Sequence, residues 1–263
     1  MTWLHDIVLG IVQGLTEFLP VSSSGHLVVV PALFGWREPS LTFDLVLHLG
    51  TLIAVVVYFW GELWALLLGV LGRGADPRAA RRMVLLLIVA SIPAGLAGVA
   101  FASFFEDRFS DPFATCFELL GTAVILLVAE WVIRRGEGHR PVDYPRAGII
   151  GIAQAVAILP GISRSGSTIA AGLVTKVSRE EATRFSFLLA IPAIAGAVAT
   201  KVPDVVDGKF HVTGPVVAGF LASLVVGWLS IAWLLRYLRT HSFVPFALYL
   251  IVFSLVAAVI IGP

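Results

Sequence analysis

Three long apolar stretches, 83–105, 212–235 and 242–263, contain no charged residue, and they constrain the fold of this chain more than any other feature. An α-helix crosses the hydrocarbon core of a bilayer with about 20 apolar residues. Three further segments, 43–71, 112–133 and 185–201, are also strongly apolar and approach or exceed that length. The sequence therefore predicts an all-α polytopic membrane protein with six transmembrane helices.

The composition excludes the other broad classes of protein. Hydrophobic residues make up 58% of the chain and charged residues 13%, against about 25% charged residues in soluble domains. The net charge of +1 argues against nucleic acid as a partner, and the single cysteine, Cys116, excludes a disulfide framework. Residues 1–10 contain no Lys or Arg and are interrupted by Asp6, so we expect no cleavable signal peptide.

Two apolar regions, 6–34 and 147–175, are interrupted midway by small and helix-breaking residues. The first break reads PVSSSG at 20–25, and the second reads PGISRSG at 160–166. Each arm is too short to span a bilayer, and irregular backbone at membrane depth is tolerated only beside protein or a wet cavity. We therefore expect both regions to form re-entrant helical hairpins.

An internal repeat relates the two hairpins. With an offset of 141 residues, 10–25 and 151–166 are identical at 6 of 16 positions. The chain, a single membrane domain, then consists of a hairpin and three spans, repeated once (about 1–134 and 147–263). Three crossings are an odd number, so the second copy is inverted, and inverted repeats with broken helices place a polar site near the bilayer midplane. Chance similarity between two Gly/Ser-rich breaks is the alternative.

The basic residues are distributed unevenly over the predicted loops. Of the 18 Lys and Arg residues, 13 fall in the loops 72–82, 134–146, 176–184 and 236–241. Short loops enriched in Lys and Arg face the cytoplasm. Both termini are therefore predicted to lie outside, with hairpin 6–34 entering from outside and hairpin 147–175 entering from the cytoplasm.

Polar residues in the first hairpin point to a functional site. Glu17 is an ionisable group at membrane depth, and Gln13 lies one helical turn before it on the same face. The first turn of the second arm contains Ser22, Ser23, Ser24, Gly25 and His26. Free backbone N–H groups at a helix N-terminus attract anions. The alternatives are that Gln13 and Glu17 cap the hairpin's own backbone and that the serines are simple N-caps.

Arg164 is the strongest indicator in the second hairpin. It lies between Ser163 and Ser165 and is followed by Gly166 and Thr168, and no acidic residue occurs between Asp143 and Glu180. A buried arginine needs an anion, and its planar guanidinium suits phosphate. We expect the helix N-termini of both hairpins to converge there on one ligand. A permanent ion pair with Glu17 that locks the two repeats together is the alternative.

Other polar residues have less specific interpretations. Asp44 and His48 could position His26, line the entrance to the site, or lie at the membrane interface. Glu62, Glu118 and Glu130 are interpreted as structural or interfacial.

Three motifs resemble those of a known family. The run QGLTEFLPVSSSGH at 13–26 is similar to the first signature of the bacterial undecaprenyl pyrophosphate phosphatases, also called bacitracin-resistance proteins. The run PGISRSGST at 160–168 resembles their second signature, and the similarity continues through FSFLLAIP at 185–192. Two long motifs at this separation are far more specific than one short pattern.

The resemblance implies an activity. It implies hydrolysis of a polyprenyl (C55) pyrophosphate lipid to the monophosphate and phosphate, which recycles the lipid carrier for cell-wall synthesis and gives bacitracin resistance. It also implies a location in the bacterial inner (cytoplasmic) membrane with the active site facing the extracytoplasmic side. A homodimer is compatible with this interpretation.

The resemblance also implies roles for individual residues. Glu17 is the essential acidic residue, Ser23 and His26 are candidates for nucleophile or base, and Arg164 binds pyrophosphate. A divalent metal is implied, Mg²⁺ or Ca²⁺, with Glu17 and Gln13 as its candidate ligands, although Gln13 stands where the family often has Glu. We favour Ser23 as nucleophile and His26 as its base. The substrate-binding candidates are Ser22, Ser24, Gly25, Ser163, Ser165, Gly166 and Thr168.

Two other functions compete with this one. Inverted repeats with broken helices are typical of secondary transporters and would equally suit a polyprenyl-phosphate flippase. Serines and a histidine at membrane depth also suggest an intramembrane serine protease, but peptide hydrolysis has no use for Arg164 at the centre of the site.

Overall fold

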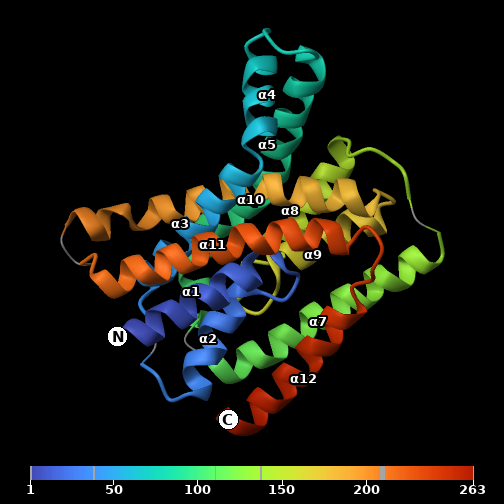
Figure 1. Cartoon of the computed structure of the whole chain (residues 1–263). Coiled ribbons are helices and arrows are strands. Elements are labelled where there is room, and N and C mark those ends of the chain that lie inside the picture. Colours follow the sequence, from blue (N-terminus) through green and yellow to red (C-terminus); the bar gives the residue numbers. More distant parts are fainter. Residues whose placement is uncertain (1, 38, 110, 137, 208–210, 263) are drawn as a thin grey trace.

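The computed structural model describes residues 2–37, 39–109, 111–136, 138–207 and 211–262, and within these ranges all regular secondary structure is helical (Figure 1). The helices are α1 (Trp3–Phe18), α2 (Ser23–Leu33), α3 (Leu41–Tyr58), α4 (Trp60–Val70), α5 (Pro77–Ala100), α6 (Ala102–Phe109), α7 (Pro112–Arg134), α8 (Tyr144–Val156), α9 (Arg164–Val174), α10 (Arg179–Val206), α11 (Gly214–Tyr237) and α12 (Val244–Ile261).

Six of these helices are long and apolar enough to cross a membrane: α3, α5, α7, α10, α11 and α12. The predicted all-helical fold with six spans is therefore confirmed. The predicted span 43–71 was wrong in its extent, because α3 ends at Tyr58 and α4 is a separate helix. Phe59 leaves the helical conformation, with φ −94° and ψ 16°. Both sides of this break are apolar, so hydropathy does not reveal it.

Helix α4 and the first part of α5 form a pair that stands out from the rest of the bundle (Figure 1). Asp76 begins α5, because its side chain accepts a hydrogen bond from the backbone N–H of Ala79. The helix therefore starts several residues before the predicted boundary at 83. It also ends at Ala100, and a short helix, α6, follows where the span was expected to continue to 105.

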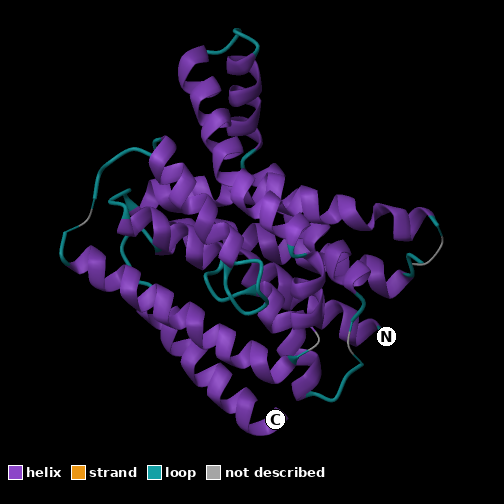
Figure 2. Ribbon diagram, turned by 180° about the vertical axis from the view of Figure 1, so that it is seen from behind, coloured by secondary structure: helices purple, strands orange, loops and turns teal. Residues whose placement is uncertain are grey.

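Both interrupted segments fold back as helical hairpins. Helices α1 and α2 pack against each other across the break at residues 19–22, and α8 and α9 do the same across residues 157–163. Gly161 has φ +92°, a conformation that favours glycine. The loops of both hairpins lie near the middle of the molecule (Figure 2). Their re-entry into a bilayer stays a prediction, because it concerns the membrane.

The two halves of the chain interlock through repeat-related glycines. Helix α1 packs along α11, and a Cβ on Gly10 would lie 2.2 Å from the carbonyl oxygen of Gly219. Helix α8 packs along α5, and a Cβ on Gly151 would lie 2.6 Å from the carbonyl oxygen of Ala90. Gly10 and Gly151 are identical positions of the repeat, so the same close backbone contact is made twice, each time with a helix of the other half.

Candidate active site

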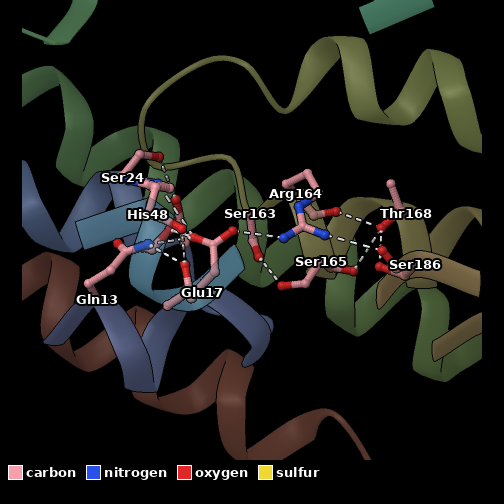
Figure 3. Close-up of polar contacts among 12 residues, drawn as sticks. Gln13, Glu17, Ser24, His48, Ser163, Arg164, Ser165, Thr168 and Ser186 are labelled. Carbon is pink, nitrogen blue, oxygen red and sulfur yellow. Dashed lines mark hydrogen bonds and ion pairs between the residues drawn. The ribbon is translucent and has the colours of Figure 1, made fainter. Parts of the chain in front are cut away.

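Glu17, in the last turn of α1, is the centre of a buried polar network (Figure 3). Its Oε2 accepts hydrogen bonds from the Ser23 hydroxyl at 2.5 Å and from Gln13 Nε2 at 3.0 Å. Its Oε1 lies 2.8 Å from Arg164 Nη2. The side chain is 6% exposed. A carboxylate at this depth is stabilised only by such a set of donors and charges.

Ser23 is the first residue of α2, directly after the break in the first hairpin. The preceding residue, Ser22, caps the helix by accepting a hydrogen bond from the backbone N–H of Gly25. Ser22 has φ +69°, a left-handed conformation that is rare for a residue other than glycine. This turn carries the Ser23 hydroxyl back toward α1 and onto Glu17.

Arg164 is the first residue of α9, so the positive charge beside Glu17 comes from the second hairpin. Its Nη1 donates to the backbone carbonyl of Ser186 at 3.2 Å, while Nη2 pairs with Glu17 (Figure 3). The hydroxyls of Thr168 and Ser186 lie 2.6 Å apart, and Thr168 also donates to the carbonyl of Arg164. The ion pair with Glu17, which was the alternative to a ligand clamp, is therefore present in this structure, and the carbonyl of Ser186 on α10 binds the other side of the guanidinium.

The tips of the two hairpins touch. Ser165 donates a hydrogen bond of 3.0 Å to the carbonyl of Leu19, and a Cβ on Gly25 would lie 2.8 Å from the Cα of Gly161. Ser163 caps α9 through the backbone N–H of Gly166, as Ser22 caps α2. The first backbone N–H groups of a helix have no carbonyl partner within it. Two helix N-termini therefore meet at the Glu17–Arg164 pair.

His48, on α3, contacts Glu17 rather than His26. Its Nδ1 donates to the backbone carbonyl of Asp44 at 2.7 Å, and its Nε2 lies 3.5 Å from Glu17 Oε2. Thr51, one turn later, accepts a hydrogen bond from Gln13 and donates to the carbonyl of His48. None of the three interpretations of Asp44 and His48 describes this contact, because His48 lies beside the central carboxylate and is bonded to the backbone of Asp44.

His26 is buried but has partners other than Ser23. Its Nδ1 lies 2.8 Å from the backbone carbonyl of Ser22, and its Nε2 lies 2.7 Å from the hydroxyl of Tyr249 on α12. Ser23 is instead bonded to Glu17. The expected pairing of Ser23 with a His26 base is therefore not the arrangement in this structure, because both ring nitrogens of His26 are occupied elsewhere.

Sequence reasoning did not assign Tyr249, Ser186 or Thr51 to the site. Ser186 lies within the third motif, and Thr51 follows His48 by three residues, so both carried a signal. Tyr249 lies within α12, more than a turn from its first residue, whereas tyrosine in membrane proteins concentrates at the interfaces. This position away from the interface was the only indication in the sequence that Tyr249 belongs to the site.

The remaining acidic residues singled out from the sequence form ion pairs away from this network. Glu62 pairs with Arg184, Glu118 with Arg108, and Glu130 with Arg179. These contacts fit the structural interpretation of the three glutamates.

The fit of a divalent cation depends on oxygen donors. Across the described ranges no group of three or more His, Cys, Asp or Glu side chains could hold a metal ion. Gln13 Oε1 is nevertheless buried and lacks a hydrogen-bond partner among the described residues, and it belongs to the side chain that contacts Glu17. Hard cations take carboxylate and amide oxygens together with substrate oxygens and water. Glu17 and Gln13 are therefore suitable ligands for a cation whose other ligands come mostly from the bound substrate.

Comparison with known proteins identifies the relatives of this chain. Residues 6–256 match the family described as "Bacitracin resistance protein BacA". The undecaprenyl-diphosphatase of Moorella thermoacetica is 45% identical over 263 residues, which cover 100% of this chain and 98% of that protein. The undecaprenyl-diphosphatases of Pelotomaculum thermopropionicum (42% identity; 99% and 97% covered) and of a Nocardioides species (38% identity; 99% and 97% covered) are similar over the same extent. The chain belongs to the bacitracin resistance protein BacA family.

Proposed function

We propose that this protein hydrolyses undecaprenyl pyrophosphate to undecaprenyl phosphate and inorganic phosphate, and thereby recycles the lipid carrier for cell-wall synthesis. One observation carries the proposal: a buried carboxylate, Glu17, holds both a serine hydroxyl and an arginine from the other half of the chain. These are a base, a nucleophile and an anion clamp. The names of the full-length relatives support the same substrate.

In the first step the Ser23 oxygen attacks the terminal phosphorus in line with the bridging oxygen. Glu17 accepts the hydroxyl proton along their 2.5 Å hydrogen bond. The bond between this phosphorus and the bridging oxygen breaks, and undecaprenyl phosphate leaves with the electron pair and takes up the proton from Glu17, which is then ionised again. In the second step Glu17 takes a proton from water, water attacks the phosphoserine, and Ser23 recovers its proton as inorganic phosphate departs.

Arg164 supplies the electrostatic part of the mechanism. Phosphoryl transfer depends mainly on positioning and on stabilising negative charge. When Glu17 becomes protonated, it no longer neutralises Arg164, so the guanidinium turns its charge to the phosphate oxygens. Arg164 therefore has two states: it pairs with Glu17 in the free site, and it binds phosphate oxygens when the substrate is present. The serines, glycines and Thr168 at the start of α2 and α9 would orient the remaining phosphate oxygens through hydroxyls and backbone N–H groups.

A divalent cation, Mg²⁺ or Ca²⁺, would be held by oxygens of Glu17 and Gln13 together with the pyrophosphate. Such an ion neutralises phosphate charge and stabilises the leaving group.

We further propose that the protein lies in the bacterial inner membrane with this site open to the extracytoplasmic side. The concentration of Lys and Arg in alternate loops supports this orientation. The apolar side chains exposed on α12, such as Leu248 and Val259, are suited to contact with lipid. A homodimer would be formed through apolar helix faces of the same kind.

The test is phosphate release from C55 pyrophosphate by the purified protein in detergent. The wild type should release one phosphate per lipid, and Ser23→Ala should not. Ser91→Ala is the matched control and should retain full activity, because within the described part of the chain the Ser91 hydroxyl bonds only the Leu87 carbonyl of its own helix. Absence of phosphate release, combined with movement of polyprenyl phosphate across proteoliposomes, would favour the flippase and refute the proposal.

A further inference from the structure

Tyr249 connects the last helix of the chain to the turn that carries Ser23. Its hydroxyl lies 2.7 Å from Nε2 of His26, and the two rings are stacked at 8° with centroids 5.7 Å apart. Phe253, one turn further along α12, stacks on the same imidazole at 4.6 Å. The two stacked rings therefore fix the orientation of the imidazole plane, and the Tyr249 hydroxyl fixes the position of Nε2.

The hydrogen bonds of His26 define its tautomer. The Ser22 carbonyl can only accept, so Nδ1 carries the proton in this 2.8 Å contact. In the neutral imidazole Nε2 is then an acceptor, and the Tyr249 hydroxyl donates to it. Neither nitrogen retains a free lone pair for a proton or for phosphorus.

The carbonyl that His26 binds belongs to Ser22, whose backbone conformation is rare for a residue other than glycine. Ser22 has φ +69°, and left-handed conformations of residues other than glycine persist only where neighbouring contacts hold them. The Nδ1 bond of His26 and the N-cap bond between Ser22 and Gly25 both hold this turn. The next residue is Ser23, whose hydroxyl is bonded to Glu17 in this conformation of the turn.

We infer that Tyr249 and His26 are positioning residues: Tyr249 fixes the His26 tautomer, and His26 holds the Ser22–Ser23 turn so that the Ser23 hydroxyl faces Glu17. This inference rests on the proposed function of Ser23. It adds Tyr249 to the site and gives His26 a role other than nucleophile or base.

The two nitrogens of His26 can be tested separately, because asparagine and glutamine each reproduce one of them. The amide N–H of asparagine reaches the position of Nδ1, and that of glutamine reaches the position of Nε2. His26→Asn should therefore keep the bond to Ser22 and retain activity within about tenfold of the wild type, the value of one hydrogen bond. His26→Gln loses that bond and should lose about a hundredfold or more. Equal, near-complete loss in both variants would overturn the inference, since a chemical role for the imidazole predicts it.

Tyr249→Phe keeps the ring and removes only the hydroxyl. We expect kcat to fall about fivefold with KM unchanged, because the hydroxyl acts on the geometry of Ser23 and not on the lipid. In the His26→Asn background the same substitution should have no further effect, because its partner is already gone. A Tyr249→Phe variant with wild-type kcat, or an equal additional loss in the double variant, would contradict the inference.

The control is Tyr144→Phe, which removes the hydroxyl of an exposed tyrosine at the start of α8 and should leave kcat unchanged. Thermal unfolding of each purified variant in detergent separates loss of geometry from loss of fold. An inactive wild type would refute the proposed phosphatase itself. An active wild type with equally inactive Asn and Gln variants would refute only the positioning role.

Discussion

The hydroxyl of Ser23 donates a 2.5 Å hydrogen bond to Oε2 of Glu17, six residues earlier in the same hairpin. This contact places the proposed nucleophile and the proposed base on one short segment, while the guanidinium of Arg164 comes from the second repeat. Glu17 corresponds to Ile158 in the repeat, and Ser23 corresponds to Arg164. The two hairpins thus share a backbone design but carry different polar residues at equivalent positions.

Ser23→Ala should reduce turnover by at least about a thousandfold and prevent formation of any covalent intermediate, because the attacking oxygen is removed. Rapid-quench trapping of labelled wild-type enzyme should show phosphate that is stable in acid and labile in base, as expected for phosphoserine. Acid-labile, base-stable phosphate would indicate phosphohistidine, and no trapped phosphate would indicate direct attack by water. Either result contradicts the serine mechanism.

Glu17→Gln should reduce turnover by about 10²- to 10⁴-fold, because the amide cannot accept the Ser23 proton. Its shape is retained, so the hairpin should still form, with Arg164 keeping its bond to the Ser186 carbonyl. The comparison is with Glu62→Gln, whose carboxylate pairs with the half-exposed Arg184 and should matter little to catalysis. Similar activities of the two variants would remove Glu17 from its assigned role.

Much of this site could be predicted from the sequence because its parts are local. The Ser-rich breaks, Glu17 and Arg164 stand out as polar groups within apolar segments, and the repeat indicated that the two breaks would meet. The structure places the tips in contact through Ser165 and Leu19. The number of spans followed from hydropathy, since a bilayer sets the length of a helix.

The parts that escaped prediction depend on long-range packing. The partner of His26 is Tyr249, 223 residues away on another helix, and no local pattern encodes that distance. The break at Phe59 is similar, because apolar residues lie on both sides of it and α4 is fixed by packing against α5. The frequent pairing of serine with histidine in catalysis favoured a Ser23–His26 pair, yet their three-residue separation does not say which way each side chain turns.

Arg164→Lys tests whether Arg164 is a clamp or only a bridge. Lysine keeps the charge but loses the planar fork, so as a clamp it should reduce turnover about a hundredfold with little change in thermal stability. If the Arg164–Glu17 pair serves only to lock the repeats, removing the cation with Arg164→Met should destabilise the fold by about 3–5 kcal/mol. Equal losses of stability and activity in Arg164→Lys would contradict the role of Arg164 as a phosphate clamp. Arg184→Lys, in an ion pair whose arginine is half exposed, is the control.

The orientation in the membrane makes a separate prediction. A single cysteine introduced at Gly262 should react with an impermeant thiol reagent from outside intact cells, and one introduced at Arg140 should not. The native Cys116 is buried and should not compete for the reagent. Labelling of position 262 only after lysis would contradict the predicted topology and the extracytoplasmic location of the site.

Gln13→Glu tests whether a metal ion binds, because we expect the substitution to lower thermal stability without Mg²⁺ and to raise it with Mg²⁺. Gln13 Nε2 now donates to Glu17, so a carboxylate there would place two negative charges side by side and lower thermal stability when EDTA is present. With Mg²⁺ the same pair gains a second anionic ligand, so the variant should be stabilised more than the wild type and reach half-maximal activity at a lower metal concentration. Gln13→Leu removes the unpartnered amide oxygen and should need more metal. Full wild-type activity in excess EDTA, with a Gln13→Glu stability that does not respond to Mg²⁺, would exclude a cation at Glu17 and leave Gln13 with the single task of orienting that carboxylate.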